Sequence, residues 1–292
     1  MKLVMLHGRS QEDKDPDRLR HKWVTSLREG AAKGGLELPI DEDDIVFPYF
    51  GDALRDLATE EPTSLARIVI AEPDHDDEEF RCRVLNECLN KAGVSESVIA
   101  EEVTEEVRDL GALSRPWVQK GLALLDRYVP GVSSATLTYM AEDVALYLNN
   151  TQVRNYIEHG VSNAFRSCET AGKVVVVGHS FGSIVAYNML RNKELVSCPV
   201  DTLITIGSPL GVTAVRESLA PIIYPDLVGS WFNAYDDQDA VALVPLDNEH
   251  FPGAQPIQNY GGVENDSRNH HGIRGYLSDR TVATRIIKAL RE

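Results

Sequence analysis

The chain has 292 residues and a formal net charge of −16, and its length allows one large or two ordinary domains with a real hydrophobic core. Hydrophobic residues make up 43% and charged residues 25% of it, which is the composition of a globular protein and excludes a wholly disordered chain. The acidic excess argues against a protein that binds nucleic acids or anionic lipid surfaces by neutralising their phosphates.

The sequence predicts neither a membrane-spanning helix nor an export signal. No run approaches the roughly 20 apolar residues of a spanning helix, and the apolar run at the N-terminus is short and soon followed by charges. The four cysteines, at positions 82, 88, 168 and 198, lack the spacing of zinc ligands. We therefore expect a cytoplasmic protein with reduced thiols and with no metal ion or other cofactor.

Five apolar runs predict β-strands. In chain order they are residues 2–6, 44–50, 173–177, 202–206 and 231–235. Helix-like spacing follows the first run at 19–27 and the third at 183–190, and a terminal helix is expected over 281–290. Apolar strands separated by helices are typical of a parallel sheet covered by helices on both faces, so the fold class is α/β.

Residues 52–170 have a different character. A short run at 68–70 is a possible strand, but helical spacing dominates, with apolar residues at Val103, Val107 and Leu110 and over 135–148 and 153–165. The acidic clusters in this segment are expected to be solvated surfaces. A crossover helix needs only about a dozen residues, so the segment predicts a helical insertion between two strands. Packing on the body and a lid over a substrate site remain alternatives.

Residues 174–182 read VVVVGHSFG and contain the pattern Gly-x-Ser-x-Gly. The letters alone are a weak signal, but here a valine strand precedes them and a helical stretch follows. A nucleophile elbow needs this context, with Gly178 and Gly182 on either side of the serine because a Cβ there would clash. We predict that Ser180 is a nucleophile and that His179 is a packing or hydrogen-bonding neighbour. The alternative is a glycine-rich turn without chemistry.

A nucleophilic serine needs an oxyanion hole of two N–H groups, one of them from the loop after a neighbouring strand. The His-Gly pair after the first strand supplies such a loop, because Gly8 lets the backbone approach the substrate closely. We assign the two donors to the backbone N–H groups of Arg9 and Phe181. An ordinary turn is the alternative for the His-Gly pair. The Arg9 side chain could hold a substrate phosphate or carboxylate, or form a surface ion pair.

The acid and the base should follow the serine in that order. An acidic loop follows the strand at 231–235, and we favour Asp239, which precedes Ala-Val, with Asp237 as the alternative. The adjacent histidines near the C-terminus supply the base, for which we favour His271, with His270 as the alternative. In this arrangement the histidine takes the serine proton and the carboxylate stabilises the imidazolium.

These motifs together resemble the α/β-hydrolase superfamily. Within it, four segments resemble bacterial serine hydrolases of the esterase and lipase type, namely LHGRSQEDKDP at 6–16, DVALYL at 143–148, IGSPLG at 206–211 and HGIRGYL at 271–277. In such enzymes the base is followed by a small residue, Ile, any residue and GYL, which supports His271.

The resemblance implies an α/β-hydrolase fold whose first two strands are absent, with a mostly parallel sheet of about six strands and helices on both faces. We expect one domain over residues 1–292, since the oxyanion loop and the histidine lie at opposite ends of the chain. The insertion at 52–170 lies inside this domain, at a place where the fold can carry a lid or cap.

We therefore predict a serine hydrolase of the EC 3.1.1 type that cleaves carboxylic esters, including lipid esters, through an acyl-enzyme. Two alternatives stay open: a catalytically silent hydrolase fold used as a binding or signalling module, and an acyltransferase on the same scaffold. The expected partner is a small-molecule or lipid ester, with no nucleic acid.

Overall fold

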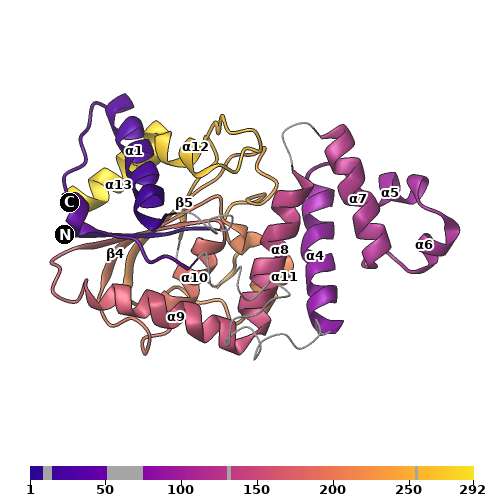
Figure 1. Cartoon of the computed structure of the whole chain (residues 1–292), viewed down its shortest axis with the longest axis horizontal. Coiled ribbons are helices and arrows are strands. Elements are labelled where there is room, and N and C mark those ends of the chain that lie inside the picture. The colour runs from indigo at the N-terminus through magenta and orange to yellow at the C-terminus, as the bar shows by residue number, and fades with distance from the viewer. Residues whose placement is uncertain (9–14, 51–74, 130–132, 254–255) are drawn as a thin grey trace.

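The computed structural model describes residues 1–8, 15–50, 75–129, 133–253 and 256–292. Its centre is a six-stranded sheet with the order β2-β1-β3-β4-β5-β6, in which every neighbouring pair is parallel (Figure 1). The strands are β1 (Lys2–Leu6), β2 (Ile45–Val46), β3 (Val174–His179), β4 (Val200–Ile206), β5 (Val228–Ala234) and β6 (Gln258–Tyr260). The predicted α/β class and parallel sheet of about six strands are confirmed.

The five predicted strands are all present, but the sheet has one strand that the apolar runs did not reveal. β6 has only three residues, Gln-Asn-Tyr, which are exposed or half-exposed at the edge of the sheet, so no apolar run marks it. β2 is shorter than its apolar run and pairs with β1 through two residues. The possible strand at 68–70 lies outside the described residues.

Helices cover both faces of the sheet, as Figure 1 shows. On one face lie α1 (Pro16–Lys33), α12 (Ile273–Ser278) and α13 (Arg280–Arg291), and on the other α9 (Thr151–Arg166) and α10 (Phe181–Leu190). Alternate residues of a strand therefore enter two different cores, and both kinds must be apolar. In β1, Leu3 and Met5 face the first layer, whereas Val4 and Leu6 face the second.

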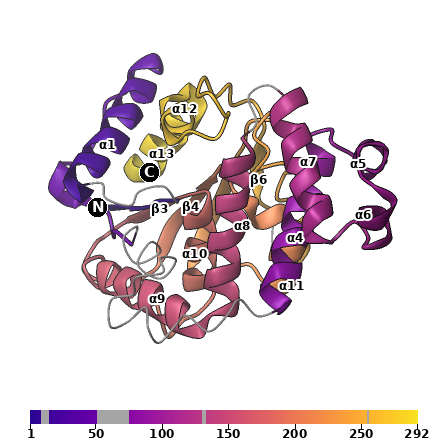
Figure 2. The same ribbon diagram turned by 45° about the vertical axis from the view of Figure 1, so that its right-hand side comes forward.

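Between residues 75 and 166, the described part of the chain from β2 to β3 consists of helices joined by short turns and loops. Its helices are α4 (His75–Lys91), α5 (Glu96–Glu102), α6 (Glu105–Asp109), α7 (Arg115–Tyr128), α8 (Ser134–Asn149) and α9. α4 packs on α7 and α8, while α8 and α9 both contact α10. Both views place α5 and α6 beyond α4 and α7, away from the sheet (Figures 1 and 2). The boundaries of an insertion and its role as a lid stay predictions.

The single helical face expected at Val103, Val107 and Leu110 is wrong. Two short helices occupy this stretch, because Thr104 starts a new helix and its side chain accepts a hydrogen bond from the N–H of Val107. Val103 is the residue at which α5 ends, and Leu110 is 63% exposed. The other predicted helices are present, with α1 about twice as long as the predicted 19–27 and the rest within two residues of their predicted limits. The remaining helices are α11 (Thr213–Ser218) and two short 3₁₀ turns, η1 (Glu42–Asp44) and η2 (Pro209–Gly211).

The four cysteines are buried and free. Burial raises the pKa of the Cys198 thiol to about 11 and also raises the pKa of the Cys82, Cys88 and Cys168 thiols. These thiols are therefore poor nucleophiles in the folded protein. A helix with the length and apolar character needed to cross a bilayer is not found in the described part of the chain.

The contact between α10 and the end of β1 depends on Gly182. A Cβ at this position would collide with the carbonyl oxygen of Leu6 and would lie 2.7 Å from that of His7. Both are backbone atoms, which cannot move aside without shifting the strand. In contrast, a Cβ at Gly160 in α9 would meet nothing within 4 Å.

We predict that Gly182→Ala lowers the free energy of unfolding by about 3 kcal/mol, since overpacking against fixed backbone strains the fold. The matched change Gly160→Ala should raise it by roughly 1 kcal/mol, because alanine favours a helix over glycine. Urea unfolding followed by circular dichroism measures both values. Equal stability of Gly182→Ala and the wild type would contradict the close approach.

Candidate active site

Ser180 occupies the tight turn between β3 and α10. Its backbone has φ 54° and ψ −128°, a conformation that residues other than glycine adopt only when their surroundings enforce it. The N–H of Ser180 donates to the carbonyl of Ile206 in β4 at 3.1 Å, and the N–H of Ser183 donates to the carbonyl of Ser180 at 2.9 Å. A Cβ at Gly178 would lie 2.8 Å from the Gly182 oxygen. The turn thus has the tightness expected of a nucleophile elbow.

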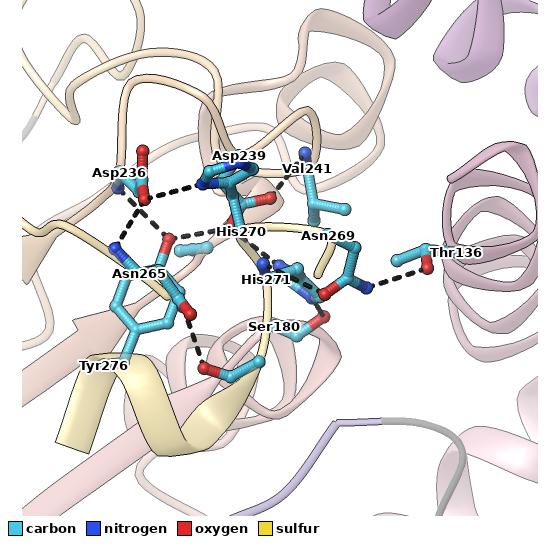
Figure 3. A network of polar contacts seen from close by, with 12 residues as sticks. Thr136, Ser180, Asp236, Asp239, Val241, Asn265, Asn269, His270, His271 and Tyr276 are labelled. Carbon is cyan, nitrogen blue, oxygen red and sulfur yellow. Dashed lines mark hydrogen bonds and ion pairs between the residues drawn. The ribbon is translucent and has the colours of Figure 1, made fainter. Parts of the chain in front are cut away.

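Three side chains from distant parts of the sequence form a continuous series of hydrogen bonds (Figure 3). Nε2 of His271 lies 2.8 Å from Oγ of Ser180, and Nδ1 of His271 lies 2.7 Å from Oδ2 of Asp239. Because Nδ1 faces a carboxylate, it carries the imidazole proton, which leaves Nε2 to accept the serine proton. This arrangement can remove a proton from the Ser180 hydroxyl.

Asp239 is fully buried, so its charge needs hydrogen-bond donors. Oδ1 accepts a hydrogen bond from the N–H of Val241 at 2.9 Å. Oδ2 accepts two, one from Nδ1 of His271 and one, at 2.6 Å, from the hydroxyl of Tyr276. The alternative acid, Asp237, is exposed on the same loop. The structure therefore brings Asp239 to His271 and leaves Asp237 at the surface.

His270, the alternative base, lies next to a different carboxylate. Its backbone has φ 53°, and its Nδ1 lies 3.5 Å from Oδ2 of the buried Asp236 (Figure 3). The two neighbouring histidines thus face different acids, and the structure places His271 beside Ser180.

The loop after β1 passes directly over the serine. A Cβ at Gly8 would lie 2.9 Å from Cβ of Ser180, so only glycine fits this approach. The N–H of Phe181 is at the first residue of α10, where the helix dipole favours negative charge. Arg9, the other predicted oxyanion donor, lies outside the described residues, and its role stays a prediction.

His7, the residue before Gly8, has a structural role that its motif did not predict. Its Nε2 accepts the backbone N–H of Phe50 at 3.1 Å, so the proton is on Nδ1, which donates to the Gly8 carbonyl at 2.7 Å. The ring is fully buried, and its centroid lies 4.0 Å from that of Phe50 in a stacked arrangement. His7 therefore fixes the peptide that follows Gly8, and the His-Gly pair was the available signal for it.

His179 supports the other side of the site. Its Nε2 lies 3.0 Å from the carbonyl oxygen of His271, and the two rings are 4.9 Å apart. Burial, and to a smaller degree the nearby His271, lowers the pKa of His179 well below its ordinary value. The neutral ring therefore donates from Nε2 and holds the backbone of His271 in place.

Asn269 connects the loop of His271 to the helical segment between β2 and β3. Its Nδ2 donates to Oγ1 of Thr136 in α8 at 3.1 Å, and its Oδ1 accepts the N–H of His271 at 3.4 Å (Figure 3). No motif in the sequence marked Asn269. Because its amide bonds to both, the position of α8 and the position of the loop that carries His271 depend on each other.

Among the residues with described positions, no group of three or more His, Cys, Asp and Glu side chains is placed to bind a metal. The side chains next to Ser180 instead supply a hydroxyl, an imidazole and a carboxylate in hydrogen-bonded order, which suits proton transfer and nucleophilic attack.

The central part of the chain is similar to a known family of proteins. Residues 138–255 match the family described as PGAP1-like alpha/beta domain, which belongs to the α/β-hydrolase superfamily. The protein has an α/β-hydrolase fold. The matched segment contains Ser180 and Asp239 and ends before His271.

A GPI inositol-deacylase from Chaetomium globosum is 29% identical to this hydrolase-fold chain over 147 residues, which covers 47% of the chain and 13% of that protein. The chain thus corresponds to a small part of this relative. No solved structure matches the chain. The predicted resemblance to bacterial esterases and lipases stays a prediction.

We predict that His179 makes the protein less stable in acid. The unfolded histidine takes up a proton as the pH falls below about 6.5, whereas the buried one stays neutral until the pH reaches its lowered pKa. In that window the unfolded state binds more protons, so the free energy of unfolding falls by up to about 1.4 kcal/mol per pH unit.

The variant His179→Gln should lose this component, so its unfolding free energy should change less between pH 7 and pH 5 than that of the wild type. Urea titrations at several pH values measure the slopes. The change His21→Gln, at an exposed position of α1, is the control and should keep the wild-type slope. The same slope in all three proteins would contradict the prediction.

Proposed function

We propose that this protein is a serine hydrolase that cleaves carboxylic esters of lipids, with Ser180, His271 and Asp239 as its catalytic triad. The observation that carries the proposal is the continuous series of hydrogen bonds from the serine hydroxyl to the buried carboxylate. The strained turn at Ser180 supports it, because such a conformation is found at functional sites. The family match and the name of the deacylase relative support hydrolysis of an acyl group.

In the proposed first half-reaction, Oγ of Ser180 forms a bond to the ester carbonyl carbon while Nε2 of His271 takes its proton. The negative charge on the carbonyl oxygen is stabilised by the N–H groups of Phe181 and Arg9. His271 then gives the proton to the leaving alcohol oxygen, and the ester C–O bond breaks. An acyl-serine remains.

In the second half-reaction, His271 removes a proton from water, which attacks the acyl-serine, and the free acid leaves as Ser180 regains its proton. Asp239 stays ionised throughout and stabilises the imidazolium in both halves. These steps need no metal ion or cofactor. The neighbours His7 and His179, both neutral and hydrogen-bonded to backbone carbonyls, keep the oxyanion loop and the base in place.

We predict that Ser180→Ala abolishes both covalent labelling by a fluorophosphonate probe and the hydrolysis of p-nitrophenyl esters, because it removes the hydroxyl that lies 2.8 Å from His271 Nε2. A series of esters of graded acyl length would also measure the size of the acyl group that the site accepts. Ser162→Ala, which removes a hydroxyl on α9 that donates a hydrogen bond to the carbonyl of Leu195, is the matched control. Failure of the folded wild type to react with the probe would refute the proposal.

The two candidate acids give a second, independent prediction. Asp239→Asn should lower kcat by roughly 10⁴-fold, because the amide cannot hold the imidazole in the required tautomer. Asp237→Asn, at the exposed position on the same loop, should keep kcat within about twofold of the wild type. Steady-state kinetics on the ester that the wild type hydrolyses fastest measures kcat for both variants. A larger loss of kcat in Asp237→Asn than in Asp239→Asn would overturn the assignment of the acid.

A further inference from the structure

Tyr276 lies in α12, shortly after His271 in the sequence, and its side chain is fully buried. Its hydroxyl lies between two aspartates (Figure 3). The oxygen is 2.6 Å from Oδ2 of Asp239 and 3.2 Å from the backbone nitrogen of Asp236. The hydroxyl therefore contacts the same carboxylate oxygen that pairs with Nδ1 of His271.

The direction of these two hydrogen bonds follows from the groups involved. The N–H of Asp236 can only donate, so the Tyr276 oxygen accepts it and directs its own proton to Asp239. Burial, followed by the nearby charge of Asp239, raises the pKa of Tyr276 well above its ordinary value. The phenol is therefore protonated at any pH at which the protein is folded and active.

The tyrosine ring has little freedom to move. A Cβ at Gly207 would lie only 3.0 Å from the ring, and a Cβ at Gly275 would collide with the side chain of Asn265. Asn265 in turn donates its N–H to Oδ2 of Asp236 at 2.8 Å. Asn265 therefore contacts both Asp236, whose N–H donates to Tyr276, and α12, the helix that carries Tyr276.

We propose that Tyr276 is a positioning residue whose hydroxyl fixes Oδ2 of Asp239 in the direction of His271. This inference rests on the proposed function. Each carboxylate oxygen has its own fixed donor, Val241 N–H on Oδ1 and Tyr276 on Oδ2, and two donors define the plane of the carboxylate. With one donor missing, the group can rotate about its Cβ–Cγ bond, and its contact with Nδ1 lengthens.

The variant Tyr276→Phe removes the hydroxyl and keeps the ring. We expect kcat to fall about tenfold, which corresponds to ~1.4 kcal/mol of transition-state stabilisation, with KM unchanged within twofold, because the tyrosine acts through Asp239. An unchanged kcat, or a loss that appears only in KM, would overturn the proposal.

Tyr187→Phe is a matched control. The hydroxyl of Tyr187 in α10 also lies between an N–H and an acceptor, namely the N–H and the carbonyl of Ile223, each at 3.0 Å. Both variants should lower the melting temperature, since each leaves buried polar groups without a partner. Only Tyr276→Phe should lower kcat. An equal fall in kcat for both would mean that the effect is a general loss of stability.

A double-mutant cycle tests whether Tyr276 acts through the acid. In an Asp239→Ala background, Tyr276→Phe should lower kcat, or the rate of fluorophosphonate labelling, no further, because the group that it positions is gone. The same tenfold loss in both backgrounds would contradict the proposal.

The proton on Nδ1 of His271 gives a readout that does not depend on ester turnover. Its far-downfield NMR signal should move upfield in Tyr276→Phe, as the bond to Asp239 lengthens, and stay in place in Tyr187→Phe. No movement, or movement in both variants, would refute the positioning role. If the wild type fails to react with the probe, the proposed function fails, and this signal still decides whether Tyr276 positions the carboxylate.

Discussion

The turn at Ser180 is the constraint on which the rest of this structure depends. A serine at φ 54° is strained by roughly 1–3 kcal/mol, so its neighbours must hold it. They do so from three directions: β4 binds its N–H through Ile206, the loop after β1 lies against its Cβ at Gly8, and α10 begins at the next residue. Around this turn, Gly8, Gly178 and Gly182 each have room for a hydrogen but not for a side chain.

The buried charge of Asp239 imposes the second requirement. A buried carboxylate is stable only with several donors, and here the donors come from its own loop, from the loop that carries His271 and from α12. Asn269 extends this hydrogen-bonded set to Thr136 in α8. Asp239 and His271 are therefore held by the same tertiary contacts that join the C-terminal part of the chain to the helices between β2 and β3.

Patterns of neighbouring residues predicted most strands of the sheet. They failed where contacts between distant residues or a helix cap determine the structure. Runs of apolar residues marked five strands, because both faces of a parallel sheet are buried, but β6 has only edge residues and no such run. The spacing of Val103, Val107 and Leu110 suggested one helix, whereas the hydroxyl of Thr104 caps a second one. The sequence favoured Asp239 because Ala-Val follows it, but it left Asp237 open, since both follow β5 and only the fold of the loop decides which of them is buried.

The sequence by itself determined the α/β class, the elbow around Ser180 and the order of serine, acid and histidine, because these depend on residue type and on spacing along the chain. Only the tertiary structure decided which carboxylate meets His271 and which carboxylate meets His270. It alone revealed Tyr276, His7 and Asn269 as neighbours of the site, and it identified the carbonyl of His271 as the partner of His179. The physical reason is that hydrogen bonds across tens to more than a hundred residues depend on how loops pack above the sheet, which no local pattern records.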